Sequence, residues 1–340
     1  MALLKADEKT MAWKNLKQQS LADGLMVNHA ALEELDDVNE LIHWDRIESM
    51  LSDIHSKRRG EKAWPPLMMF KALLLQSWYS LSDPGLEKQL ARDLLFRRFV
   101  DLSLSESVPD HSTFWRFRNL LEDTGLLETL LEEINAQLAV KGLLIRSGEV
   151  SIIDASVIKA KQNRPKKDKN GNSTQDPEGA YNVKQGSDGK IKTTYGFKTH
   201  ANVDEDGFIK TYDYTAGNVH DSNVFETLLT GHEKEVYADS AYKSNAHDQL
   251  LKKKGTRNRV LERAYRNKPL TADQKYSNRM NSGVRSIVER VFGVLKLHYG
   301  MGQARYLGLS RNKARFGLMS LAYNIKRGVS IQRSILQVAG

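Results

Sequence analysis

The most restrictive feature of this sequence is a change in the spacing of its apolar residues near Gly148. Before this point, apolar residues recur at three- and four-residue intervals, the pattern of helices with one buried face. The first apolar run after it, Val150–Ile158, is short and rich in β-branched residues, which favours a strand in a packed sheet. This order predicts a helical domain in residues 1–145 and a sheet-containing domain in residues 146–340.

The first domain is expected to be all helical, because no segment in it alternates polar and apolar residues as a half-buried strand does. Pro65 and Pro66 are suited to open a helix, since the N–H group that proline lacks would have no partner within the helix in its first turn. Asp110 or Ser112 can cap a later helix, and Gly125 can end it. The predicted helices are residues 44–54, Leu67–Tyr79, Asp83–Leu94, Thr113–Asp123 and Leu126–Val140.

The second domain combines strands, helices and one long polar segment. Residues 159–190 are rich in Lys, Asn, Asp, Gly and Gln, and are predicted to form an exposed loop. The predicted strands are Val150–Ile158, Thr193–Val203, Phe208–Tyr214, Glu235–Ala238 and Arg259–Leu261. The predicted helices are Ser222–Leu229, Asn245–Lys254, Val284–His298 and Arg311–Arg327. Together they predict a mixed sheet flanked by helices, of the α+β or α/β class.

Composition excludes several kinds of protein. The chain has no cysteine, which excludes disulfides, thiolate metal sites and cysteine nucleophiles and suits a reducing cytoplasm. No run approaches the 18 or so apolar residues of a membrane span, so no membrane partner is expected. The charged segment Met1–Lys17 lacks the apolar run of a signal peptide.

Positive charge is concentrated at the carboxyl-terminal end. Residues 251–340 contain 20 Lys and Arg against three acidic residues, a balance of +17, whereas the whole chain has a net charge of +9. A basic block on an otherwise acidic scaffold favours a polyphosphate partner, because each neutralised phosphate releases counterions. The alternatives are a solvated surface helix or a basic disordered tail, and the apolar spacing within the block argues against the tail.

Three carboxylates stand in unusual positions. Asp154 lies in the middle of an apolar strand, where a charge is costly unless it is paired or bound to a metal. Asp239 directly follows a second predicted strand, and Glu289 lies on a helix rich in Arg and Lys. If the two strands are parallel neighbours, their carboxyl ends bring the aspartates together. Three hard oxygen donors predict Mg²⁺, with Mn²⁺ as a substitute and two ions per active site, rather than zinc.

Each carboxylate also has an ordinary structural interpretation. Asp154 can accept backbone hydrogen bonds at a strand edge, and Asp239 can cap a helix. Glu289 can form a routine ion pair with Arg285 one turn earlier. Arg285 and Lys296 fall on the same stripe of this helix as Glu289, so a carboxylate suited to metal is flanked by cations suited to phosphate.

The surroundings of these residues resemble the bacterial insertion-sequence transposases of the DDE type, specifically the insertion-sequence-five family. The resemblance runs from about Trp64 to Arg327. In the helical domain it rests on the stretch from Trp64 to Leu121, which contains His111-Ser112-Thr113-Phe114-Trp115-Arg116-Phe117, and in the second domain on short segments around the three carboxylates and between them. These segments are Ile153-Asp154-Ala155-Ser156, Tyr195-Gly196-Phe197-Lys198, Gly217-Asn218-Val219-His220-Asp221-Ser222, Ala238-Asp239-Ser240-Ala241-Tyr242 and Arg285-(three residues)-Glu289-(six residues)-Lys296. One departure is Ser282, where the family often has a tyrosine three residues before the arginine.

The resemblance implies an RNase-H-like fold in which Asp154, Asp239 and Glu289 are the catalytic metal ligands. It also implies cleavage at the ends of a DNA element and strand transfer into target DNA, by a homodimer or larger assembly in the bacterial cytoplasm, associated with the nucleoid. The partner is double-stranded DNA, both terminal inverted repeats and target. Arg285, Lys296 and Arg290 are the expected DNA contacts of the catalytic domain.

Several alternatives stay open at this point. A nuclease of the RNase H superfamily would use the same carboxylates without joining DNA, and a domesticated DNA-binding protein would use none of them. In the helical domain, Arg116 and Arg118 are candidate DNA contacts, but the aromatic residues between them are equally compatible with core packing and a solvated face. His220 is expected to lie near the active site, with Asp221 or Ser222 capping the next helix.

Overall fold

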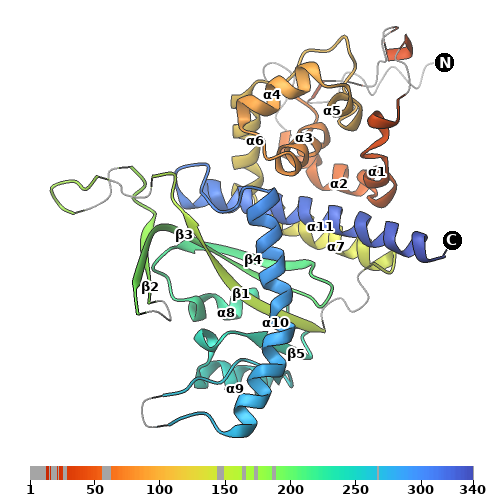
Figure 1. The fold of residues 1–340 in the computed structure, drawn as a ribbon. Coiled ribbons are helices and arrows are strands. Elements are labelled where there is room, and N and C mark those ends of the chain that lie inside the picture. The colour runs from red at the N-terminus through yellow and green to blue at the C-terminus, as the bar shows by residue number, and fades with distance from the viewer. Residues whose placement is uncertain are drawn as a thin grey trace. The chain divides into compact units, whose positions relative to one another are not determined.

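The computed structural model describes residues 13–14, 16, 21, 23–25, 29–55, 63–143, 149–162, 166–171, 175–185, 189–265 and 268–339 (Figure 1). These belong to two compact units, one of residues 1–138 and 321–340 and the other of residues 139–320. Most of Met1–Lys17, Gly148 and parts of the predicted loop lie outside the described residues. None of the described helices has both the length and the apolar composition needed to cross a bilayer.

The first unit is helical, as predicted. Its central element is α3 (Pro66–Trp78), in which almost every residue is buried because the apolar residues surround the helix on most sides. Around it lie α1 (Asp36–Leu41), α2 (Trp44–Leu51), α4 (Asp83–Arg92), α5 (Leu94–Phe99), α6 (His111–Asp123) and α7 (Leu126–Val140), with short 3₁₀ turns η1 (Asp23–Leu25), η2 (Ala30–Glu33) and η3 (Ser52–His55).

Two helix starts in this unit are set by aspartate caps. The prediction of one helix from Asp83 to Leu94 was wrong, because Asp93 leaves the helical conformation and its carboxylate accepts hydrogen bonds from the first amides of α5. Of the two predicted caps for α6, the structure has Asp110, whose Oδ1 accepts from the amide of Thr113 at 2.7 Å. Hydrogen bonds from Ser112 and Thr113 lower the pKa of Asp110 to about 2.

The last helix, α11 (Leu309–Ala339), begins in the second unit and ends in the first. The Nδ2 of Asn324 donates to Oδ1 of Asn135 at 2.7 Å, and the indole of Trp78 donates to the carbonyl of Ala322 at 2.8 Å. Gly328 lies so close to Leu138 that a Cβ there would be 2.6 Å from its Cδ2. These contacts place residues 321–340 with the helical unit, whereas the sequence analysis grouped all of residues 146–340 together.

The second unit is built on a mixed six-stranded sheet flanked by helices, consistent with an RNase-H-like α+β fold. Its strand order is β2-β3-β1-β5-β6, with β4 also paired to β3. The strands are β1 (Val150–Lys159), β2 (Ala180–Gln185), β3 (Ile191–Val203), β4 (Ile209–Ala216), β5 (Glu235–Ala238) and β6 (Arg257–Asn258). The pairs β1–β3, β2–β3 and β3–β4 are antiparallel, and β1–β5 and β5–β6 are parallel.

Three predicted elements differ from the structure. The loop predicted over residues 159–190 contains β2, which gains its strand geometry from pairing with the start of β3. The strand predicted at Arg259–Leu261 lies two residues earlier, as β6. The amides of Arg259 and Leu261 still donate hydrogen bonds to the carbonyls of Val236 and Ala238 in β5. The helix predicted at Ser222–Leu229 is a 3₁₀ turn, η4 (Asp221–Val224), followed by the short α8 (Phe225–Leu228).

Helices cover both faces of the sheet. Side chains alternate along β1, so Ile153 and Asp154 point to opposite faces. Ile153 packs in a core with residues of β5, α8 and α9 (Asn245–Lys253). The other face is crossed by α10 (Ala272–His298), as Figure 1 shows, and this helix begins earlier than predicted because Thr271 and Gln274 form a capping box. Asp154 therefore faces α10.

The hairpin turn between β3 and β4 contains a buried carboxylate, Asp204, whose Oδ1 accepts from the amide of Phe208 at 2.8 Å. Burial raises the pKa of Asp204 to about 6. The negative charge of Asp206 also raises this pKa, and the positive charge of Lys210 lowers it. Because the folded-state pKa lies above the unfolded value, the folded state binds more protons, and stability falls as the pH rises from about 4 to 6.

Asp204→Asn is therefore expected to stabilise the protein at pH 7.5 by about 1–3 kcal/mol, since the amide keeps the acceptor oxygen and cannot ionise. The gain should disappear near pH 4, where the wild-type carboxyl is neutral. Urea unfolding at both pH values measures this difference. Glu205→Gln, at an exposed carboxylate of the same turn, is the control, and an equal pH response in both variants would contradict the assignment.

Candidate functional site

The first two candidate carboxylates are brought together by the parallel pairing of β1 and β5. Ile153 is in register with Ala238, so Asp154 in the middle of β1 and Asp239 directly after β5 are the residues that follow the last pair of these parallel strands. Each bonds locally: Oδ1 of Asp154 accepts from the amide of Ala155 at 2.8 Å, and Oδ1 of Asp239 accepts from the amide of Ser240 at 2.6 Å. Asp239 also caps the turn η5 (Ser240–Tyr242), so its capping role and its place beside Asp154 coexist.

The third carboxylate and a cation come from α10. The Nη2 of Arg285 lies 3.1 Å from Oδ2 of Asp154 and 3.7 Å from Oε1 of Glu289. Its Nη1 lies 4.0 Å from Oδ1 of Asp239. One largely buried guanidinium therefore contacts all three carboxylates, which come from the middle of β1, from the residue after β5 and from α10.

Exposure differs sharply among the three acids. The side chain of Asp154 is 19% exposed, that of Asp239 is 45% exposed and that of Glu289 is 59% exposed. Burial raises the pKa of Asp154, Arg285 opposes this, and the charge of Asp239 raises it further. The site is thus a half-open acidic patch with its most buried member, Asp154, at the base.

These residues fit a hard divalent cation by their chemistry. Three carboxylates share one guanidinium, so two negative charges at the site have no counter-charge from Arg285. A largely buried carboxylate such as Asp154 is stabilised by pairing or by metal, and carboxylate oxygens are the ligands that Mg²⁺ prefers. Among the described residues, no three acidic or histidine side chains converge as a preformed metal site. In the structure the three carboxylates instead share the guanidinium of Arg285.

The other predicted contacts on α10 are accessible. Lys296 and Arg290 are exposed, and Glu289 lies between them and Arg285 along the chain. Desolvation lowers the pKa of Lys296, as does the positive charge of Lys184 on β2, while Asp154 opposes the shift. Lys184 has no distinguishing sequence signal, because this residue lies within a Lys-rich segment that was predicted to be a loop.

In the segment after β4, the helix cap differs from the prediction. His220 itself caps η4, with its Nδ1 accepting from the amide of Ser222, so neither Asp221 nor Ser222 is the cap. Asp221 instead forms an ion pair with Lys198 of β3. The Nζ of Lys198 lies 2.8 Å from Oδ1 of Asp221 and 2.7 Å from the carbonyl oxygen of Val219. The available sequence signal was a lysine placed among apolar residues of a strand.

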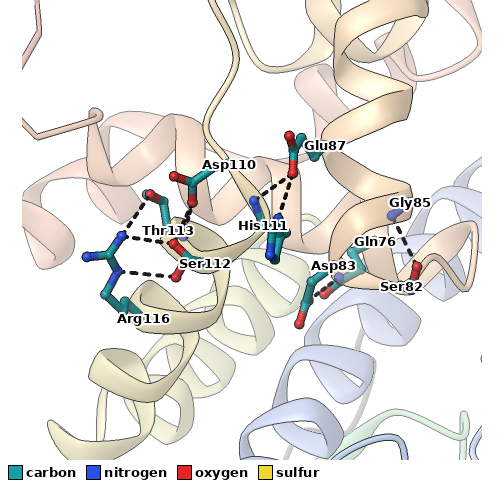
Figure 2. A network of polar contacts seen from close by, with 10 residues as sticks. All are labelled: Gln76, Ser82, Asp83, Gly85, Glu87, Asp110, His111, Ser112, Thr113 and Arg116. Atoms are coloured by element: carbon teal, nitrogen blue, oxygen red, sulfur yellow. Dashed lines mark hydrogen bonds and ion pairs between the residues drawn. The ribbon is translucent and has the colours of Figure 1, made fainter.

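The helical unit separates the two arginines that were predicted to contact DNA. Arg116 is exposed at the start of α6, where it donates to Ser112 (Figure 2). Arg118 is only 1% exposed, and it donates to Asp83 and to Oε1 of Gln76. The prediction that Arg118 contacts DNA was wrong, because its position on α6 points into the core, where Asp83 neutralises it.

Comparison with known protein families gives two matches in this chain. Residues 25–120 match the family described as Transposase domain (DUF772). Residues 145–325, more than half of the chain, match the family described as Transposase DDE domain. The second match contains Asp154, Asp239, Arg285, Glu289 and Lys296. No solved structure matches the chain.

Proposed function

The chain belongs to the DDE transposases of insertion sequences, and from this premise we propose that it cleaves DNA at the ends of its element and joins them to a target. Asp154, Asp239 and Glu289 are the proposed catalytic residues and metal ligands. Membership of the insertion-sequence-five branch remains a prediction, supported by the residue segments around these three acids.

One observation carries this proposal: the carboxylates of three residues far apart in the sequence all contact the guanidinium of Arg285. A structural ion pair needs one carboxylate, whereas three create an excess of negative charge that a cation relieves. Their mixed exposure also suits a site that must admit DNA, since Asp239 and Glu289 reach solvent while Asp154 is held at the base.

Some of these residues would bind metal ions, and others would bind DNA phosphates. When bound, two Mg²⁺ or Mn²⁺ ions would supply activation of the attacking oxygen and stabilisation of the leaving oxygen in an in-line phosphoryl displacement. Asp154, Asp239 and Glu289 would hold these ions. Arg285 and Lys296 would hold the phosphates beside the reacting bond, because guanidinium and ammonium groups donate strongly to phosphate oxygens.

DNA is the proposed partner beyond the catalytic site as well. Arg290 on α10 and Arg116 on α6 are exposed cations from the two units, and the carboxyl-terminal 90 residues carry most of the excess positive charge. Such contacts position DNA through its phosphates without reading the sequence. Joining two element ends to one target requires two active sites, so a dimer or larger assembly on DNA is proposed.

A strand-transfer assay tests this function. The substrate is a labelled duplex ending in the terminal inverted repeat, incubated with protein, Mg²⁺ and a target duplex. We expect a cleaved 3′ end and a longer labelled product in which that end is joined to the target. Cleavage without joining would favour a nuclease of the RNase H superfamily. Binding with neither product, from a folded protein, would favour a non-catalytic DNA-binding protein.

A further inference from the structure

The segment of residues 259–262, directly after β6, is hydrogen-bonded both to β5 and to α10. On the side of β5, the amide of Leu261 donates to the carbonyl of Ala238 at 3.0 Å. The amide of Arg259 donates to the carbonyl of Val236 at 2.8 Å. Ala238 is the last residue of β5 and precedes Asp239, so the segment is fixed to the backbone that carries the second carboxylate.

The bonds between this segment and α10 come from two asparagine side chains. The Oδ1 of Asn278 accepts from the amide of Glu262 and its Nδ2 donates to the carbonyl of the same residue, each at 2.9 Å. The Nδ2 of Asn281, which is 8% exposed, donates to the carbonyl of Arg259 at 3.1 Å. Asparagine is a poor residue for a helix interior, because its amide competes for backbone groups. Two asparagines bonded to one external segment therefore indicate a docking role.

Glu262 also connects α10 to the turn that begins after Asp239. Its Oε1 lies 2.9 Å from Nζ of Lys243, the residue directly after the turn η5. Asp239 caps this turn through its own carboxylate. The backbone of Glu262 is thus bonded to Asn278 of α10, while its side chain is paired with the far end of the turn that Asp239 opens.

Asn278 lies on the face of α10 that carries the site residues. At about 100° per residue, Arg285 and Glu289 fall within about 20° of the stripe of Asn278, and Glu289 is about three turns further along. Apolar packing of Val288 and Phe292 also holds the helix in place, but such contacts are non-directional. A pair of hydrogen bonds has a defined direction, so Asn278 fixes the rotation of α10 about its axis.

We propose that Asn278 and Asn281 are positioning residues of the candidate site, which set the distance between Asp239 and Glu289 through the segment of residues 259–262. The inference rests on the proposed function and deepens it. Divalent cations accept their oxygen ligands only within a narrow range of distances, and the groups that orient such ligands affect metal affinity strongly. Without these two side chains, Glu289 could shift relative to Asp239.

The test is Asn278→Ala in the full chain. The midpoint for Mn²⁺ binding, followed by the electron paramagnetic resonance of free Mn²⁺, should rise roughly tenfold. At a fixed Mn²⁺ concentration below this midpoint, kcat for cleavage of the labelled end should fall while KM for DNA stays unchanged. Additional Mn²⁺ should restore much of the lost kcat, a response that a loss of folded protein would not give.

Thr271→Ala is the matched control on the same helix. Thr271 forms its capping-box hydrogen bonds with Gln274 in the first turn of α10, outside the contact with residues 259–262. Its loss should lower the free energy of unfolding in urea and leave the Mn²⁺ midpoint of wild type. Asn281→Ala, which removes a single bond to the segment, is the second test variant and should raise the midpoint by less than Asn278→Ala does.

Wild-type midpoints in both asparagine variants would overturn the inference, as would an equal rise in Thr271→Ala. Asp154→Asn in the same titration separates this inference from the proposed function. If the wild-type protein binds Mn²⁺ and Asp154→Asn does not, wild-type midpoints in the asparagine variants count against the positioning role alone. If Asp154→Asn binds Mn²⁺ as the wild-type protein does, or if neither binds it, the proposed function fails as well.

Discussion

Replacing Asp154 with asparagine is expected to reduce both cleavage and strand transfer by several orders of magnitude, while DNA binding and folding survive. The substitution keeps the size of the side chain and its acceptor oxygen for the amide of Ala155, but removes the charge that a hard cation requires. Stability without metal should be unchanged or higher, since burial raises the pKa of this carboxyl and so disfavours its charged form. The measurements are the strand-transfer assay and a thermal melt.

A matched control is available on β4, which is separated from β1 by β3. Asp213 on β4 has the same local geometry as Asp154, with its Oδ1 accepting from the amide of the next residue at 2.7 Å. Asp213→Asn should retain cleavage within a few-fold of wild type. If Asp154→Asn is well folded and cleaves at a similar rate to Asp213→Asn, the three-carboxylate mechanism is wrong.

The second large effect is expected on stability, at Arg118 in the helical unit. Arg118→Leu should lower the free energy of unfolding by about 3–5 kcal/mol, because it leaves a largely buried carboxylate, Asp83, without its cation. Gln76 would also lose a donor, since its Oε1 accepts from Arg118 at 2.8 Å. Gln76 and Asp83 are bonded to each other across α3 and α4 in Figure 2, so the loss affects three helices.

Urea unfolding followed by circular dichroism measures this change. Arg116→Leu is the control, because Arg116 lies on the same helix, is exposed, and donates to Ser112 and Thr113 in the first turn of that helix. It should cost less than about 1 kcal/mol. Equal effects of the two substitutions would show that the buried pair contributes nothing specific. Restoring stability by a second change, Asp83→Leu, would identify the unpaired carboxylate as the cause.

The elements that the sequence predicted well are those whose cause is local. The aspartate before α6 caps it through its own side chain, and the prolines before α3 set its first turn. The β-branched run of β1 and the turn between β3 and β4 are likewise encoded within a few residues of themselves. For the same reason Asp154 could be selected, because an acid in an apolar strand is anomalous wherever the strand lies. Asp239 and Glu289 were selected by the short segments around them.

Only the tertiary structure decided the relations between distant segments of the chain. The strand β2 could not be seen in a polar segment, because its geometry comes from hydrogen bonds to β3 rather than from its own residues. The part of α11 around Asn324 and Gly328 packs with the helical unit through Asn135 and Leu138, which no local pattern signals. Arg118 and Arg116 have the same chemistry, but Arg118 lies on the buried face of α6, where the tertiary structure places Asp83 beside it.

The candidate site shows the same division. The sequence by itself determined that Asp154, Asp239 and Glu289 were the acids to examine, and that Arg285 shares the stripe of Glu289 on one helix. Only the tertiary structure decided that the guanidinium of Arg285 reaches all three. The physical reason is that electrostatic contacts depend on distances of a few ångströms, and these are set by how the sheet and α10 pack.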